Sequence, residues 1–472
     1  MNATDLLLAE AGTLERLLRP RSVAIVGASE QPNKVGGRPL TYLREQGFAG
    51  AIYPVHPHAT TVQGVPAFAS LTALPEVPDA VILCVPSDQI EAELERCASL
   101  GVQHVVLFAS GYAEVGGEGV GRQQQLLNIC RQTGMRLVGP NSIGTADFAS
   151  GAVLSFASIY ADHPPLDGPI AIVSQSGAFG VAAYALLRAA GLGVRYVVAT
   201  GNEADLDTAD FIAELVSDAT IRVVLLYLEG VKSDARLRAA LEAARERGVA
   251  VIAVRAARSP EGRRSAGLHT ASTCAGGAVL DELFEACGCR TVADLTEWVA
   301  GVPLYLAARA APSPATPRVA LISNSGASCV IAADAADALG LPLAVLAPDT
   351  LALLDACLPR FSLNRNPIDL TAMLLTDPAL LGRVLTALLT DAGVDAASLG
   401  LVAIGGPSYD VARFARECRQ AAQEAGKPLV VHSPHPHVRA TFAQHGHAVF
   451  DTEAQALHGL RAHARHLHAL NR

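Results

Sequence analysis

The sequence predicts an α/β protein built from doubly wound, mostly parallel sheets. Short apolar runs rich in β-branched residues alternate with amphipathic stretches such as residues 89–99, whose apolar positions recur at helical spacing. Half of the 472 residues are hydrophobic but only 5% are aromatic, so Ala, Val, Leu and Gly must fill the cores. This composition is typical of parallel sheets covered by helices on both faces.

The β-rich runs fall into three groups, which suits the length of the chain. We expect strands at residues 22–27, 51–55, 80–85, 104–109 and 135–138, then at 169–173, 194–199, 222–228 and 249–254, and finally at 318–322, 400–404 and 428–431. Three prolines between Ala311 and Pro317 cannot lie inside a helix or a central strand. The predicted domains are therefore residues 1–150, 165–308 and 318–472, with a linker at 309–317.

The composition also excludes several classes of protein. A net charge of −9 argues against a nucleic-acid binder, which usually carries a basic face. The apolar runs are too short to span a bilayer, and nine scattered cysteines without a CxxC pair indicate reduced thiols. Histidines 432, 435, 437, 445 and 447 follow no spacing typical of a metal site. We expect a cytoplasmic protein with no metal and no nucleic-acid or membrane partner.

A glycine turn, Gly27-Ala28-Ser29, follows the first strand and leads toward a helix. Such a turn points backbone N–H groups at an anion, as in nucleotide-binding domains. The dinucleotide pattern GxGxxG is absent, because Ser29 and Pro32 occupy the places of the second and third glycines. An NAD-dependent oxidoreductase is therefore disfavoured.

The second strand ends at His56 and His58, where an NAD site usually places an acidic residue. Together with Lys34 and Arg38, these imidazoles could line a pocket for a ligand with extra phosphates, such as coenzyme A. Alternatively, the histidines only cap a strand end. The stretches 85–87, 110–121 and 139–142 follow other strands, and we expect them to converge on the same crevice.

The second and third groups of strands begin alike. Each starts with a strand, a polar turn and a glycine that opens a helix, at residues 172–178 and 321–327. This similarity suggests two related units, although two unrelated units could converge on the same strand-turn-helix solution.

These motifs together resemble the α subunit of the NDP-forming acyl-CoA synthetases, the superfamily that includes succinyl-CoA ligase and ADP-forming acetate–CoA ligase. The resemblance covers nearly the whole chain, in family order, at residues 26–29, 47–50, 53–55, 137–141, 174–177, 200–205 and 366–370. It implies a Rossmann-like CoA-binding domain followed by two flavodoxin-like domains.

The resemblance also implies a reaction and the residues that perform it. Acyl-CoA, ADP and phosphate are interconverted with a carboxylic acid, CoA and ATP, and a histidine carries the phosphoryl group. His269 matches that histidine, in what we interpret as a long Arg-rich loop, and Glu229 matches the acid that orients it. Ser174, Ser176 and Gly177 match the site that holds the phosphoryl group. The residues that match the CoA site are Gly27, Ala28, Ser29, Lys34, Pro54, His56, Val85, Pro86, Ser110, Gly111, Pro140 and Asn141.

Some positions depart from the family pattern. Leu268 and Ala271 stand where Ser and Gly are usual, and the missing glycine stiffens the segment around His269. A non-catalytic CoA-binding or regulatory protein that kept the fold is therefore the alternative. No segment offers the Lys-rich strands and paired carboxylates that ATP and Mg²⁺ need, so we expect a separate ATP-grasp β subunit, in an α2β2 or similar assembly. The substrate would be a small carboxylic acid.

Overall fold

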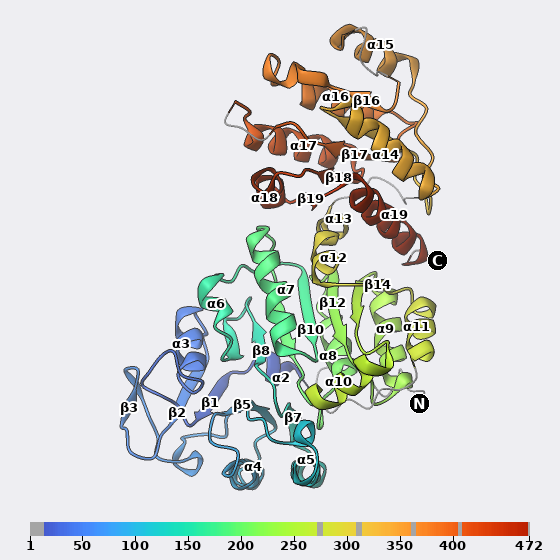
Figure 1. The fold of residues 1–472 in the computed structure, drawn as a ribbon. Helices are drawn as coiled ribbons and strands as arrows, with labels where there is room; N and C mark the ends of the chain where they lie inside the picture. The colour runs from blue at the N-terminus through green and yellow to red at the C-terminus, as the bar shows by residue number, and fades with distance from the viewer. Residues whose placement is uncertain (1–13, 271–276, 308–313, 360–364, 405–407, 471–472) are drawn as a thin grey trace. The chain divides into compact units, whose positions relative to one another are not determined.

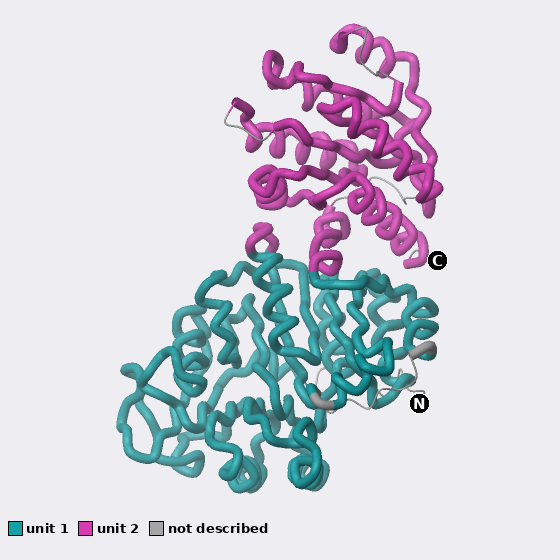
Figure 2. Tube along the Cα trace, in the orientation of Figure 1, with its two compact units in different colours: residues 1–188, 193–295 teal, residues 189–192, 296–472 magenta. Residues whose placement is uncertain are grey.

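The structure, a computed structural model, describes residues 14–270, 277–307, 314–359, 365–404 and 408–470. The chain divides into two compact units (Figure 2). The first comprises residues 1–188 and 193–295, and the second comprises residues 189–192 and 296–472. The expected linker at 309–317 lies partly outside the described residues.

The first sheet of the first unit is parallel and buried. Its strands are β1 (Ser22–Val26), β2 (Ala51–Val55), β5 (Ala80–Leu83), β6 (His104–Leu107) and β7 (Arg136–Val138), in the order β2-β1-β5-β6-β7. The helices α2 (Glu15–Leu18), α3 (Arg38–Glu45), α4 (Ile90–Ser99) and α5 (Glu118–Thr133), the 3₁₀ turns η1 (Leu71–Ala73) and η2 (Ala113–Val115), and the short strands β3 (Thr61–Val62) and β4 (Val65–Pro66) surround it (Figure 1). The strand order reverses between β1 and β5, and ligands of doubly wound sheets bind at such a switch point.

The second sheet belongs to the same unit. It runs β14-β13-β12-β10-β11-β8-β9, with β10 (Ile170–Ser174), β11 (Tyr196–Ala199), β12 (Val223–Leu228), β13 (Ala250–Arg255) and β14 (Arg290–Val292) parallel. Its helices are α6 (Ile159–Asp162), α7 (Gly177–Ala189), α8 (Thr208–Leu215), α9 (Asp234–Glu246), α10 (Pro260–Thr270) and α11 (Gly277–Ala286). The antiparallel hairpin of β8 (Gly144–Asp147) and β9 (Ala152–Ser155) extends the edge, a feature that the sequence analysis missed.

The second unit holds the third sheet, β16-β15-β17-β18-β19. Its strands are β15 (Val319–Ser323), β16 (Ile368–Asp369), β17 (Ala396–Gly400), β18 (Leu429–His432) and β19 (Ala448–Phe450). Its helices are α12 (Leu295–Ala300), α13 (Val302–Leu306), α14 (Gly326–Ala338), α15 (Pro348–Cys357), α16 (Leu380–Thr390), α17 (Val411–Ala425), α18 (Pro436–Gln444) and α19 (Glu453–Leu470), with η3 (Thr371–Leu375).

The expected strand at 400–404 was wrong, because the apolar run Leu401 to Ile404 follows the strand. The ladder instead uses the small, fully buried residues of β17. In all three sheets the five parallel strands follow one order, in which the first strand lies between the second and the third. The predicted α/β class with doubly wound domains is confirmed.

One continuous core joins the two sheets of the first unit. Ile25 and Leu40 of the first sheet and its helices belong to the same buried cluster as Val173 and Val198 of the second. Burial of apolar surface drives folding, and the shared cluster therefore makes the two sheets one compact body.

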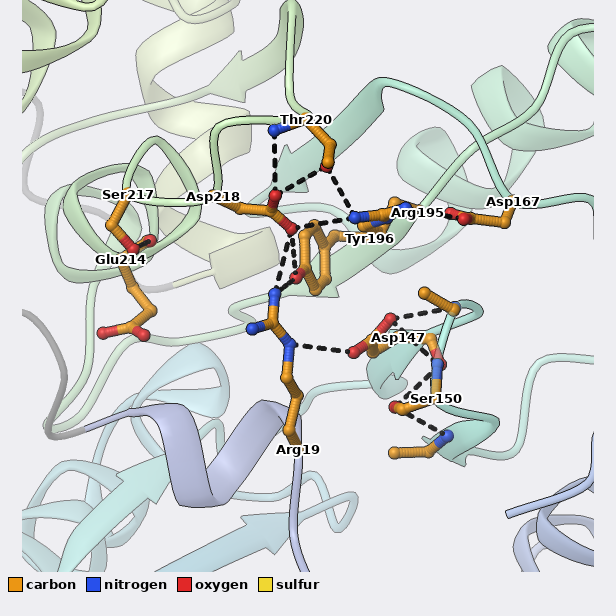
Figure 3. A network of polar contacts seen from close by, with 12 residues as sticks. Arg19, Asp147, Ser150, Asp167, Arg195, Tyr196, Glu214, Ser217, Asp218 and Thr220 are labelled. Carbon is orange, nitrogen blue, oxygen red and sulfur yellow. Dashed lines mark hydrogen bonds and ion pairs between the residues drawn. The ribbon is translucent and has the colours of Figure 1, made fainter. Parts of the chain in front are cut away.

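A polar network centred on Asp218 reinforces this contact (Figure 3). Its carboxylate accepts hydrogen bonds from Arg19 (2.9 Å), which follows α2, and from Tyr196 (2.9 Å) and Arg195 (3.2 Å), which lie at the start of β11. Arg19 also pairs with Asp147 of β8. Burial opposes ionisation of Asp218, but hydrogen bonds from Thr220, Tyr196 and Arg195 outweigh it and hold the pKa of this carboxyl below its usual range.

Replacing Asp218 should therefore destabilise the first unit. We expect Asp218→Ala to cost about 1–3 kcal/mol in unfolding free energy, because Arg19, Arg195 and Tyr196 each lose a hydrogen bond to its carboxylate. The loss is partial, since Arg19 keeps its contact with Asp147 and Arg195 keeps its pair with Asp167. A lowered folded-state pKa stabilises the protein above the unfolded value, about 3.9, and that contribution disappears as the pH falls through the acid range. Urea unfolding at pH 7 and pH 3 measures both effects. Equal losses of stability at the two pH values would contradict this account.

Among the described residues, no helix is long and apolar enough to cross a membrane. In the same part of the chain, no three His, Cys, Asp or Glu side chains gather in a way that could hold a metal ion.

Candidate functional site

The turn after β1 packs directly on the loop after β5. Gly27 has φ +82°, and a Cβ there would lie 2.9 Å from the carbonyl oxygen of Cys84. Gly36 approaches just as closely, since its Cβ would lie 2.1 Å from the carbonyl oxygen of Gly27. Only glycine fits these positions. The two loops therefore meet at the switch point, as the sequence predicted.

The backbone N–H groups of this turn were predicted to point at an anion, but they bond to carbonyl groups of the protein. Gly27 and Ala28 donate to the carbonyl of Val55 (3.1 and 3.3 Å), and Ser29 donates to the carbonyl of Gly36 (3.2 Å). These three N–H groups hold the turn itself and do not point at an anion. Lys34 is exposed farther along the same turn, so a ligand here would meet side chains first.

His56 caps the end of β2. Its Nδ1 accepts the N–H groups of His58 (3.2 Å) and Ala59 (3.0 Å), which matches the capping alternative for this nitrogen. The proton then resides on Nε2, which is left to donate to a ligand. Pro54 is buried within β2, whereas the His58 side chain is exposed.

The loops after β6 and β7 run side by side at the same edge. Asn141, with φ +57°, donates its N–H to the carbonyl of Ala109 (2.8 Å) and follows the buried Pro140. Gly111 donates its N–H to Glu114 (2.5 Å), whereas Ser110 is exposed. Of the loop after β5, Val85 is half-buried and Pro86 exposed. The predicted convergence of these loops holds for their backbones.

The loops after β6 and β7 are tied to the helix that carries His269. The side-chain amide of Asn141 donates to the carbonyl of His269 (3.3 Å) and to Asn202 (3.2 Å). Asn202 in turn donates to Glu114 (2.5 Å) and Gln123 (3.0 Å). A chain of hydrogen bonds thus leads from the loop after β6 to the histidine helix, within the first unit.

His269 and Glu229 lie together, as the sequence predicted. Nδ1 of His269 is 2.8 Å from Oε1 of Glu229, whose side chain is 3% exposed, while the imidazole is 54% exposed. Tyr227 donates its hydroxyl to the same carboxylate oxygen (3.0 Å). A carboxylate on Nδ1 keeps the proton there and leaves the Nε2 lone pair as the nucleophile.

The segment around His269 was predicted as a loop, and this was wrong. His269 lies in the last turn of α10. Ser259 caps the helix by accepting the N–H of Gly262 (3.0 Å), and Pro260 fits its first position. Ala271 lies outside the described residues.

The arginines near His269 are mostly engaged by the protein. Arg255 is buried and pairs with Asp281 (2.6 Å), which Arg258 also reaches (3.5 Å). Arg263 donates to the carbonyl of Arg258 (2.8 Å). These contacts anchor the start of α10.

The turn between β10 and α7 brings the predicted phosphate residues to the helix N-terminus. Ser174 donates its hydroxyl to the carbonyl of Ser176 (2.6 Å), and both serines are buried. Gly177 is the first residue of α7, where backbone N–H groups favour an anion. Sequence reasoning gave no role to the buried residues Gln175 and Glu203, although both stand in motifs of the resemblance.

Two family models match this chain. A CoA binding domain matches residues 21–147, and a succinyl-CoA ligase like flavodoxin domain matches residues 167–305. The α subunit of ADP-forming acetate–CoA ligase I from Pyrococcus furiosus is 33% identical over 373 residues, which cover 76% of this chain and 77% of that protein. The chain belongs to the ADP-forming acyl-CoA synthetase family.

Other members of this synthetase family support the assignment. A trans-feruloyl-CoA synthase from an unknown prokaryotic organism is 32% identical over 80% of this chain and 53% of its own length. The dinucleotide-forming acetyl-coenzyme A synthetase 1 of Ca. Korarchaeum cryptofilum, solved with phosphate and ADP, superposes with a TM-score of 0.85 at 26% identity, over 97% of both chains. The resemblance found in the sequence is thereby confirmed, and the family consists of acid–thiol ligases.

Proposed function

We propose that this chain is the CoA-binding, phosphohistidine-bearing subunit of an ADP-forming acyl-CoA synthetase. It interconverts acyl-CoA, ADP and phosphate with a carboxylic acid, CoA and ATP. The observation that carries the proposal is the 2.8 Å contact between Nδ1 of His269 and the buried carboxylate of Glu229. This pair retains the geometry of a phosphoryl carrier despite the sequence departures beside it, which favours an enzyme over a non-catalytic relative.

The chemistry proceeds through three transfers. Phosphate attacks the thioester carbonyl of acyl-CoA, the C–S bond breaks, and acyl phosphate and the CoA thiol result. Nε2 of His269 then attacks the phosphorus, the P–O bond to the acyl group breaks, and the carboxylate leaves. Glu229 balances the positive charge that the imidazole gains when the N–P bond forms. The phosphoryl group finally passes to ADP, and the ring is restored.

The turn between β10 and α7 is suited to hold the transferring group. The side chain of Gln175 accepts the backbone N–H of Glu229 (2.6 Å), which ties this turn to the strand end that carries the carboxylate orienting His269. We assign the N-terminus of α7 and these serines to phosphate binding.

We assign CoA to the crevice at the switch point of the first sheet, with the residues matched by sequence. Gly27→Ala should raise the dissociation constant for CoA about 10-fold or more, because the new Cβ meets the loop after β5 and the residue must keep φ +82°. Calorimetric titration with CoA measures the change. Gly47→Ala is the control, since Gly47 also has positive φ (+72°) but nothing within 4 Å of its Cβ. Equal CoA affinity of folded Gly27→Ala and wild-type protein would contradict the site.

ATP or ADP with Mg²⁺ is assigned to a separate ATP-grasp β subunit, in an α2β2 or similar assembly in the cytoplasm. The substrate is a small carboxylic acid. The test of the function is to purify the chain with its partner and assay a panel of acids with CoA and ATP or GTP. Acid-dependent consumption of CoA supports the proposal, whereas CoA binding without turnover of any acid supports the regulatory alternative.

A further inference from the structure

Gln175 clamps the carboxyl end of β12. Its Oε1 accepts the N–H groups of Glu229 (2.6 Å) and Gly230 (3.2 Å), and its Nε2 donates to the carbonyl of Gly230 (2.8 Å). The side chain is buried, so every polar atom of its amide is satisfied inside the protein. The clamp therefore fixes the backbone that presents Glu229 to His269.

Glu203 fixes the orientation of the Gln175 side-chain amide. Its Oε2 accepts the second hydrogen bond from Nε2 of Gln175 (3.0 Å), while Oε1 contacts the Thr200 hydroxyl (2.9 Å) and the N–H of Thr208 (3.0 Å). Glu203 is 4% exposed and has φ +54°, a conformation that is uncommon for this residue type. Backbone in this region persists where the surroundings enforce it, often at functional sites.

We propose that Gln175 and Glu203 are positioning residues for phosphoryl transfer, acting in series through Glu229 on His269. Glu203 orients Gln175, Gln175 holds the strand end, and the strand end sets the carboxylate that selects the tautomer of the imidazole. This inference rests on the proposed function of His269 as the phosphoryl carrier.

The Glu203 carboxyl has a raised pKa. Burial, reinforced by the nearby Asp207 carboxylate, raises its pKa to about 8 even though Lys232 and hydrogen bonds from Thr200 and Gln175 act in the opposite direction. The Thr200 hydroxyl also lies 3.5 Å from the carbonyl of Ser174.

Three variants separate this role from simple folding. Gln175→Ala should slow phosphorylation of His269 by at least about 10-fold, with CoA affinity unchanged within about twofold. Glu203→Ala should act in the same direction. Glu203→Gln should slow phosphorylation less than Glu203→Ala, because its amide keeps one acceptor oxygen while its NH2 group faces a donor, either the N–H of Thr208 or Nε2 of Gln175. Asp391→Asn, a buried acid of the second unit that accepts the N–H groups of Ala347 and Gly393, is the matched control and should keep the wild-type rate.

A pH measurement gives an independent readout. Between the ordinary pKa of 4.5 and about 8, the folded protein holds a proton on Glu203 that the unfolded chain has lost. Stability should therefore fall as the pH rises through this window, and Glu203→Gln should remove that slope. An unchanged slope in Glu203→Gln would overturn the assignment of a neutral Glu203.

The tautomer of His269 distinguishes failure of the clamp from failure of the proposed function. In ¹⁵N NMR of the full chain, wild type should show the proton of His269 on Nδ1, and Gln175→Ala and Glu203→Ala should show a mixture of tautomers. This readout needs no turnover. Folded Gln175→Ala and Glu203→Ala with the wild-type tautomer would overturn the inference. If the wild-type chain is never phosphorylated, the proposed function is overturned. The tautomer measurement then still tests whether Gln175 and Glu203 position the imidazole.

Discussion

His269→Ala is expected to abolish labelling of the chain by radioactive ATP in the presence of Mg²⁺ and its partner subunit. The wild-type chain should carry a phosphate that is acid-labile and alkali-stable, as expected for an N–P bond. The variant has no ring nitrogen at the exposed end of α10, and overall turnover should fall by about 10⁴-fold or more because the covalent route is lost. Scintillation counting of the isolated chain, together with an assay of acid-dependent CoA consumption, measures both effects.

His437→Ala is the matched control for this variant. His437 is also an exposed histidine on a helix, α18, but it belongs to the second unit. It should label and turn over like the wild type. Persistent alkali-stable labelling in His269→Ala would remove His269 from the role of carrier and would transfer the search to another histidine.

Glu229→Gln is expected to have the second-largest effect on the chemistry. The amide can still meet Nδ1 of His269, but it lacks the charge that stabilises the imidazolium in the transition state and can also bind the wrong tautomer. We expect phosphorylation to slow about 100-fold, the upper end of losses typical for partners that orient a histidine. Rapid-quench measurement of the phosphorylated chain gives the rate constant directly.

Tyr227→Phe distinguishes the effect of the Glu229 charge from the effect of the hydrogen bond that the carboxylate accepts. It removes one hydrogen bond to the carboxylate but keeps the ring, whose centroid lies 4.5 Å from that of Phe179. The rate should fall only a few-fold, since the contact between His269 and the Glu229 carboxylate remains. If Glu229→Gln were phosphorylated as fast as Tyr227→Phe, the orienting role of the carboxylate would be rejected.

The sheets could be predicted from the sequence because parallel strands buried on both faces are continuous apolar runs. Strands without that signal were missed or displaced. All five residues of β17 are buried, but it begins with the weakly apolar Ala396, Ala397 and Ser398, and the stronger apolar run just beyond the strand displaced the prediction. β14 was missed because it is short and starts with Arg290.

The pairing of His269 with Glu229 was predicted by resemblance, since its motifs align two positions that are 40 residues apart. The helix that carries His269 was not predicted. Gly262 and Gly267 indicated a loop and outweighed the helix-start signal at Ser259 and Pro260. Nor could the sequence show which carbonyls satisfy the amides of the turn at Gly27, because that depends on how Gly36 folds back. The Gln175 clamp joins strand ends that only the tertiary structure brings together.

The shared core of the first unit limits how the protein can be divided or recombined. A cut at residue 150 falls between β8 and β9, so it would split a hairpin that extends the second sheet and separate Asp147 from that sheet. It would also divide the buried cluster that Ile25 and Leu40 share with Val173 and Val198 of the second sheet. The CoA-binding region is therefore not a transplantable module, and exchanging it among synthetases would require moving both sheets as one block.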